Sequence, residues 1–167
     1  CLSHDFLYHD LSNMMIFAGN HDTDRLGDVV GRNYNKAKLG ITMLATMRGI
    51  PQLFAGDEMM FYSKDLSQGH GGLRVDFPGG WAGDKADYFT PEGREQHPVI
   101  ADRYDYSRTL FQWRKSKEVI HNGKTLHFMT RDNTYAYFRY NDKEVVFVYI
   151  NNSQEPKHLP WSYYKEI

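Results

Sequence analysis

The sequence of 167 residues is poor in cysteine, in long apolar runs and in excess charge of either sign. Its single cysteine, Cys1, excludes an internal disulfide and a thiolate metal cluster. No apolar run approaches the roughly 20 residues that a membrane-spanning helix needs, so membrane insertion is not expected. The net charge is only −1, from 20 Lys and Arg against 21 Asp and Glu. Because the chain has no excess of positive charge, we do not expect it to bind nucleic acid.

Ligand sets for metals and phosphates are also missing from the sequence. His4, His9 and His70 have no partner histidine four residues away and no carboxylate at the spacing of a metal site. We therefore expect them to be solvated or locally hydrogen-bonded. No cluster of oxygen ligands suggests calcium, and the glycine-rich residues 69–72 lack the strand-to-helix context of a phosphate loop. We predict no metal and no cofactor.

Aromatic residues, in contrast, are plentiful. They make up 15% of the chain, with 12 Tyr, 10 Phe and 3 Trp. Packing in a core or a sheet accounts for most single tyrosines. The excess is also typical of a protein that stacks sugar rings, so it favours a carbohydrate over a charged ligand.

The most informative segment follows a short apolar run at residues 14–18. This run predicts a buried strand, and it leads directly into Asn20, His21 and Asp22. A strand that ends in this way brings an imidazole and a carboxylate to one point. In a barrel of parallel strands, catalytic and ligand-binding groups collect at the carboxyl ends of the strands. The segment is therefore a candidate part of an active site.

A second strand is predicted close to the first. Residues 34–48 have helical periodicity with Asn33 as a candidate cap, and the apolar residues 50–55 follow and stop at Asp57 and Glu58. Strand, helix and strand within about 45 residues predict a right-handed βαβ unit with parallel strands. Both strands then end in acidic residues at the same edge.

The rest of the chain divides into an irregular and a regular part. Residues 56–102 are rich in glycine and show little periodicity, which is uncommon in a compact domain unless the segment is functional or disordered. We expect residues 74–81 to fold over the strand ends. A helix is predicted at residues 102–117. Beyond it the period changes to two, which predicts antiparallel strands at residues 125–130, 134–140 and 144–151.

These segments resemble the alpha-amylase superfamily, glycoside hydrolase family 13, and within it the neopullulanase and cyclomaltodextrinase group. The resemblance is carried by residues 17–22 (FAGNHD) and 49–58 (GIPQLFAGDE), at the places of barrel strands seven and eight. It implies an α/β fold class: the C-terminal part of a (β/α)8 TIM barrel over residues 1–122, followed by a partial antiparallel all-β domain over residues 123–167. We expect the chain to be a fragment of a longer enzyme.

The resemblance implies retaining hydrolysis of α-glucosidic bonds in α-glucans such as pullulan, cyclodextrins and maltooligosaccharides. Asp22 matches the carboxylate that stabilises the transition state, and His21 matches a histidine that hydrogen-bonds the same sugar. Arg25 is predicted either to bind substrate or to pair with Asp22 or Asp24. Trp81 is predicted either to stack on a glucose ring or to hold its loop to the barrel.

The nucleophile and the acid/base residue of this family come from strands four and five, outside the resemblance. Glu58 matches the motif of strand eight, so we reject it as a catalytic acid, and we expect Asn20 to shape its loop. The fragment alone is expected to be inactive and to self-associate through exposed barrel edges. The alternative is a non-catalytic carbohydrate-binding or assembly module, in which the aromatic residues and Asp22 hold an oligosaccharide without cleaving it.

Overall fold

The computed structural model of the chain describes residues 5–159 and 161–165. Cys1 and His4, for which the sequence made predictions, lie outside the described residues. The elements follow in the order η1 (Asp5–Leu7), η2 (Leu11–Asn13), β1 (Met15–Phe17), α1 (Leu26–Val29), α2 (Tyr34–Thr46), β2 (Ile50–Gln52), η3 (Asp57–Met59), η4 (Leu66–Gln68), α3 (His70–Leu73), α4 (Pro91–Glu95), α5 (Pro98–Lys115), α6 (Glu118–Asn122), β3 (Lys124–His127), β4 (Thr134–Tyr140), β5 (Val145–Asn151) and η5 (Trp161–Tyr163).

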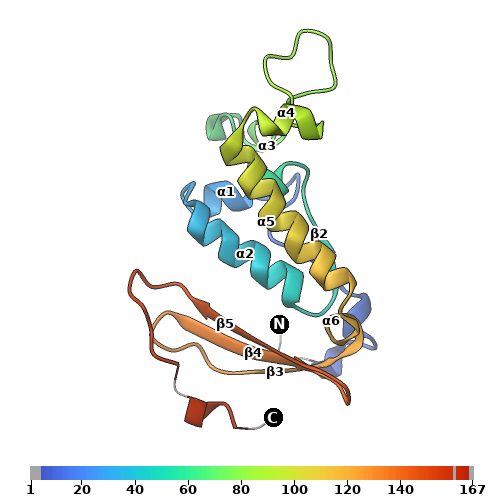
Figure 1. Cartoon of the computed structure of the whole chain (residues 1–167), viewed down its shortest axis with the longest axis vertical. Helices are drawn as coiled ribbons and strands as arrows, with labels where there is room; N and C mark the ends of the chain where they lie inside the picture. The colour runs from blue at the N-terminus through green and yellow to red at the C-terminus, as the bar shows by residue number, and fades with distance from the viewer. Residues whose placement is uncertain (1–4, 160, 166–167) are drawn as a thin grey trace.

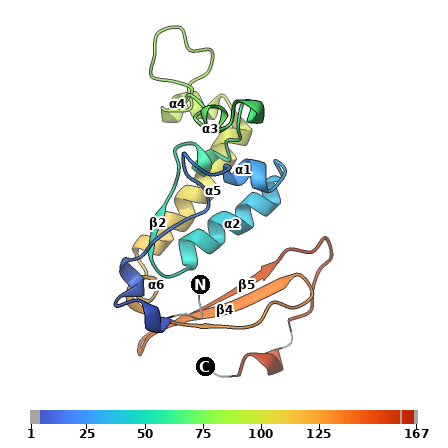
Figure 2. The ribbon, with the colours of Figure 1, turned by 180° about the vertical axis from the view of Figure 1, so that it is seen from behind.

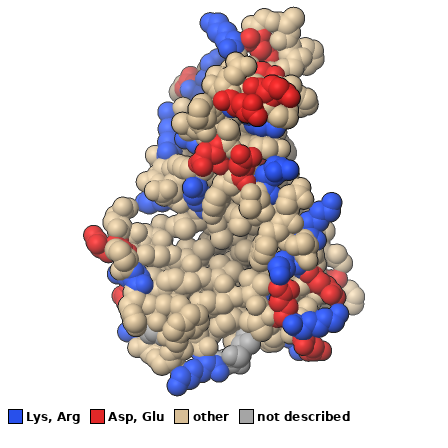
Figure 3. All heavy atoms as spheres, in the orientation of Figure 1, with Lys and Arg blue, Asp and Glu red and all other residues tan. Residues whose placement is uncertain are grey.

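The molecule is elongated, with the β3–β5 sheet at one end and the loop before α4 at the other (Figure 1). The helices α2 and α5 lie between them, and the view from behind shows β2 running beside the same helices (Figure 2). Acidic and basic side chains are interspersed on the face in Figure 3, and uncharged side chains dominate over the sheet. None of the described helices is long and apolar enough to cross a membrane.

The predicted parallel βαβ unit is confirmed. β1 and β2 pair in parallel, with Ile16 opposite Pro51, and α2 connects them. The cap of α2 is the predicted one, since Asn33 Oδ1 accepts a hydrogen bond from the backbone of Lys36 at 3.1 Å. The predicted burial of the first strand is not observed, because Met15 is 59% exposed and, among the described residues, β2 is the only strand beside β1.

The core of this half lies between α2 and α5. Ala37 and Ile41 on α2 are 1% and 0% exposed, and they cluster with Leu26 and Met60. Tyr106 and Leu110 on α5 pack against the same cluster. The helix begins four residues before the predicted start, at Pro98, because proline is well suited to the first turn of a helix.

The segment predicted to be irregular contains short helices. η3, η4, α3 and α4 all lie within residues 56–102 and are three to five residues long. Local side-chain caps explain part of this order. Thr90 Oγ1 accepts a hydrogen bond from the backbone of Gly93 at 3.1 Å and so begins α4. Periodicity does not reveal such single turns, since they bury no continuous stripe.

The predicted antiparallel strands are confirmed as the sheet β3-β4-β5. Asp132 and Asn133 both have positive φ, 51° and 60°, which is the geometry of a two-residue hairpin turn. Tyr137, Val148 and Ile150 form a second core cluster. Side chains from α2 pack against this cluster, so the sheet packs against the βαβ unit. These side chains are Leu39 and Met43 of α2 and Met47, which directly follows it.

Candidate functional site

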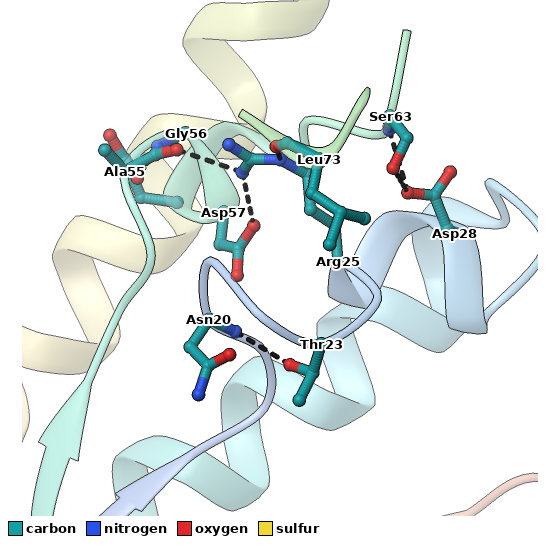
Figure 4. Close-up of polar contacts among 10 residues, drawn as sticks. Asn20, Thr23, Arg25, Asp28, Ala55, Gly56, Asp57, Ser63 and Leu73 are labelled. Atoms are coloured by element: carbon teal, nitrogen blue, oxygen red, sulfur yellow. Dashed lines mark hydrogen bonds and ion pairs between the residues drawn. The ribbon is translucent and has the colours of Figure 1, made fainter. Parts of the chain in front are cut away.

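The loop after β1 is shaped by its own polar side chains. Asn20 Oδ1 accepts a hydrogen bond from the backbone of Asp22 at 2.8 Å. Thr23 Oγ1 accepts one from the backbone of Asn20 at 3.0 Å (Figure 4). These bonds form an Asx-type turn that turns the chain sharply after the strand. The expected role of Asn20 in shaping the loop is confirmed.

His21 and Asp22 are presented to solvent by this loop. Their side chains are 60% and 54% exposed, and His21 Nε2 lies 3.0 Å from Asp22 Oδ2. One carboxylate oxygen therefore has the imidazole beside it, while much of the carboxylate stays open to a ligand. The predicted meeting of imidazole and carboxylate at the end of the first strand is present in the structure.

Two further basic side chains approach Asp22 from the glycine-rich segment. His70 Nδ1 lies 3.5 Å and Arg74 Nη2 lies 3.4 Å from Asp22 Oδ1. Arg74 Nη2 also donates a long hydrogen bond of 3.5 Å to the carbonyl of His21. His70 is 63% exposed, as expected of a solvated histidine, and α3 also brings it close to a carboxylate 48 residues earlier in the chain.

The result is an exposed carboxylate flanked by three basic side chains, and we call these four residues the Asp22 cluster: His21, Asp22, His70 and Arg74. A carboxylate can accept hydrogen bonds from neutral hydroxyl groups, and N–H groups of flanking side chains can donate to oxygen atoms. The spacing of four residues between His70 and Arg74 places both on one side of a helical turn. That spacing is the only sequence signal that points to them.

Arg25 lies underneath this surface and not in it. It is 1% exposed, and its Nη1 lies 3.0 Å from Oδ1 of the equally buried Asp57 (Figure 4). Its predicted partners were Asp22 or Asp24, so the ion pair is a correction. Because its side chain is almost fully buried, Arg25 cannot contact a ligand directly. The predicted substrate-binding role of Arg25 is therefore replaced by a role in positioning the loops around it.

Arg25 connects three segments that support the Asp22 cluster. Its Nε donates to the carbonyl of Leu73 at 2.7 Å, and its Nη1 donates to the carbonyl of Ala55 at 3.0 Å. Its guanidinium also lies 4.0 Å from the centre of the Phe54 ring. Because Leu73 immediately precedes Arg74, this network fixes α3 relative to the loops after β1 and β2.

Burial raises the pKa of Asp57 from 3.8 to about 6, and the nearby charge of Arg25 offsets this effect only in part. The neighbouring Glu58 has a different role. Its Oε2 accepts a hydrogen bond from the backbone of Gly56 at 2.9 Å, which caps the turn after β2. This contact agrees with the structural role predicted for Glu58.

Trp81 belongs to a different group of residues from Asp22. It is 79% exposed and stands at the mouth of a cleft of about 820 Å³, beside Phe77 and Phe89. Its backbone donates to Asp84 Oδ2 at 3.3 Å, so Asp84 helps to hold this loop. Within residues 5–159 and 161–165, no three His, Cys, Asp or Glu side chains gather as metal ligands.

Comparison with known proteins gives one matching family and several related amylases. Residues 125–167 match the cyclo-malto-dextrinase C-terminal domain family. A beta/alpha-amylase of Paenibacillus polymyxa is 31% identical over 162 residues, which cover 90% of this chain and 11% of that protein. The chain thus spans about a tenth of the length of this relative.

Solved structures of amylases have the same fold. The alpha-amylase from H. orenii is 28% identical, with a TM-score of 0.66 over 82% of this chain and 29% of that one. The alpha-amylase from Geobacillus thermoleovorans, solved with acarbose, is 24% identical with a TM-score of 0.64, over 89% and 29% of the two chains. On the matching family, the relative and the shared fold together, this chain belongs to the alpha-amylase superfamily, glycoside hydrolase family 13, and corresponds to the C-terminal region of its members.

Proposed function

We propose that this chain supplies the last two strands of a (β/α)8 barrel, within residues 1–122, and the start of a C-terminal β domain, within residues 123–167, in an α-glucan glycosidase. The observation that carries the proposal is the Asp22 cluster at the carboxyl end of β1. In barrels of this kind the carboxyl ends of the strands form the active-site face. The neighbouring parallel strand β2 supports the same placement.

The proposed chemistry is retaining hydrolysis of an α-glucosidic bond. It needs a carboxylate nucleophile and a second carboxyl group that acts first as acid and then as base. We assign neither role to this chain and place both residues in a part of the protein outside these 167 residues. Asp22 accepts hydrogen bonds from sugar hydroxyls, and these bonds strengthen as positive charge develops on the sugar ring.

The flanking donors complete the proposed sugar site. His21 is held beside the Asp22 carboxylate and donates to the same sugar residue. His70 and Arg74 keep the carboxylate in place and offer further N–H groups to ring oxygens or hydroxyls. A neutral, hydroxyl-rich ligand suits this set of one acceptor and three donors. Acarbose, which the Geobacillus thermoleovorans structure contains, is a ligand of that chemistry.

Hydrolysis in a chimaera tests the proposal. The matching segment of the H. orenii alpha-amylase is replaced by this chain, and reducing-sugar release from maltoheptaose and pullulan is measured. The chain alone is expected to release nothing, and the chimaera is expected to be active.

Asp22→Asn is expected to lower the activity of the chimaera by at least about a hundredfold. Asp24→Asn, in the same exposed loop, is the matched control and is expected to keep the activity. Equal activity of the two variants would refute the role of Asp22. Release of sugar by the chain alone would show that the missing carboxyl groups lie within it.

A further inference from the structure

We propose that Asp28 is a positioning residue for the Asp22 cluster. Asp28 belongs to α1, the single-turn helix that follows the loop after β1. It acts by holding residues 63–74, the segment whose far end carries His70 and Arg74 to Asp22. The inference rests on the proposed function, because it concerns how two donors of that sugar site are held in place.

The Asp28 carboxylate binds the beginning of this segment. Its Oδ2 accepts a hydrogen bond from the backbone of Ser63 at 2.8 Å and a second one from Ser63 Oγ (Figure 4). Hydrogen bonds to an ionised acceptor are roughly twice as strong as those between neutral groups. Ser63 is 1% exposed, so loss of the carboxylate leaves two buried donors without their acceptor. The position of Ser63 thus depends on Asp28.

The residue before Asp28 brings α1 close to the same part of the chain. Gly27 is buried, and a β-carbon at this position would lie 2.5 Å from the carbonyl oxygen of Phe61. A larger side chain therefore does not fit unless the backbone of Phe61 moves away. Because α1 lies directly against the chain two residues before Ser63, the short side chain of Asp28 is long enough to reach Ser63.

The residues after Ser63 connect it to α3. The backbone of Lys64 donates to the carbonyl of Gly72 at 3.2 Å. A β-carbon at Gly72 would lie 1.8 Å from the carbonyl oxygen of Asp65, so α3 and residues 64–65 touch backbone to backbone. Asp65 Oδ1 also accepts hydrogen bonds from the backbone and Oγ of Ser67 at 2.9 and 2.7 Å, which holds the turn between them. A shift of Ser63 is therefore passed on to α3.

The two ends of α3 carry the members of the Asp22 cluster. His70 begins the helix and Arg74 follows it, and they lie 3.5 and 3.4 Å from Asp22 Oδ1. Both distances are long for polar contacts, so a displacement of α3 by about 1 Å is enough to break them. The other anchor of α3 is Arg25, which precedes α1 and donates to the carbonyl of Leu73. Both anchors therefore come from one turn of helix.

The test measures acarbose affinity of the 167-residue chain by isothermal titration calorimetry. Asp28→Ala removes the acceptor of both hydrogen bonds from Ser63, and we expect it to weaken binding by about three- to tenfold. Asp28→Asn keeps one side-chain oxygen that can accept both bonds, so it should bind within about twofold of the natural chain. Asp24→Ala, at an exposed acidic residue four positions earlier, is the matched control and should bind like the natural chain.

A double-mutant cycle gives a measurement that a loss of stability alone does not change. If Asp28 acts through α3, Asp28→Ala should weaken binding by less than about twofold in a chain that already carries His70→Ala and Arg74→Ala. Urea unfolding establishes that each variant is folded at the temperature of the titration. Ser63→Ala removes one of the two donors and is expected to weaken binding by about twofold, which covers the case in which Asp28→Ala does not fold.

The outcomes separate this inference from the proposed function. If Asp22→Asn weakens acarbose binding but Asp28→Ala and Ser63→Ala do not, the proposed function stands and the positioning role of Asp28 is refuted. If Asp28→Ala weakens binding equally with and without His70 and Arg74, it does not act through α3, and the inference is also refuted. If the natural chain and Asp22→Asn bind acarbose equally, or neither binds it, the proposed function fails and the inference fails with it.

Discussion

Arg25 and Asp57 tie the loop after β1 to the turn after β2, with 3.0 Å between Nη1 and Oδ1 and with both side chains at most 3% exposed (Figure 4). The two residues lie 32 positions apart, and each follows a different strand. This contact fixes the relative position of the two strand ends below the exposed Asp22 cluster. The function proposed for the surface thus depends on an ion pair that a ligand never touches.

Removing one member of this pair is expected to destabilise the fold. Arg25→Met leaves the Asp57 carboxylate buried without its partner and removes donors from the carbonyls of Ala55 and Leu73. We expect the free energy of unfolding, measured with urea, to fall by about 3–5 kcal/mol. Arg74→Met is the control at an exposed arginine and should change it by less than about 1 kcal/mol. Equal effects of the two variants would contradict this role for Arg25.

The raised pKa of Asp57 predicts a specific pH dependence of stability. Because its pKa is about 6 in the folded chain, against an ordinary 3.8, the folded chain binds this proton more tightly than the unfolded chain does. The contribution of Asp57 to stability therefore grows as pH falls from about 6 to about 4 and is lost as pH rises through 6. The shift corresponds to about 3 kcal/mol.

Asp57→Asn is the matched variant for this measurement. The difference in unfolding free energy between the natural chain and the variant should change across pH 4 to 6, in favour of the natural chain at pH 4. Three other carboxyl groups have a lowered pKa because of hydrogen bonds: Asp5 from Arg48, Asp65 from Ser67 and Asp87 from Thr90. Their contribution to the stability of the folded chain is lost only as pH falls below their ordinary pKa of 3.8. These three contributions are the same in the natural chain and in Asp57→Asn, so they cancel in the difference between the two unfolding free energies. A constant difference would contradict the prediction.

Arg114 is expected to be irreplaceable at the end of α2. It is 5% exposed and donates to the carbonyls of Ala45, Met47 and Gly49 at 2.9, 2.9 and 2.6 Å. Helix ends leave carbonyls without partners, and a planar guanidinium can serve several at once. Arg114→Lys should therefore lower the free energy of unfolding by about 1–3 kcal/mol.

The neighbouring Lys115 provides the control for Arg114. It is exposed in the same helix, so Lys115→Met should change stability by less than about 0.5 kcal/mol. Thermal unfolding followed by circular dichroism measures both variants. If Arg114→Lys unfolds at the same temperature as the natural chain, the three carbonyls do not need a guanidinium.

His70 and Arg74 are expected to contribute to sugar affinity. His70→Ala and Arg74→Ala each remove a donor beside Asp22 and leave its carboxylate freer to move. We expect each to weaken acarbose binding by about fivefold. His9→Ala, at an exposed histidine on another segment, should bind like the natural chain. Unchanged affinity in both cluster variants would limit the site to His21 and Asp22.

Local signals in the sequence predicted much of the fold. The cap at Asn33 and the period of two in residues 134–140 and 144–151 depend on neighbouring residues, and the structure has both. The strand ending in His21 and Asp22 was also visible, because the apolar run and the polar stop are adjacent. The resemblance to the alpha-amylase superfamily was confirmed by the related proteins.

The parts that sequence reasoning missed depend on contacts between distant segments. The predicted folding of residues 74–81 over the strand ends agrees with the contact between Arg74 and Asp22, but no periodicity showed that His70 and Arg74 are the residues that reach this carboxylate. The pairing of Arg25 with Asp57 depends on how two loops meet below the surface. In both cases the residue types were noticed, but their partners could not be chosen from spacing alone.

Acarbose binding by the purified 167-residue chain tests the central claim most directly, because it asks whether the Asp22 carboxylate binds a sugar. Backbone NMR spectra are recorded during titration of the natural chain, Asp22→Asn and the control Asp24→Asn. We predict saturable shifts at His21, Asp22 and Arg74 in the natural chain and in Asp24→Asn. In Asp22→Asn we expect affinity at least about tenfold weaker. Equal affinity in all three proteins, or shifts confined to other surfaces, would contradict the account.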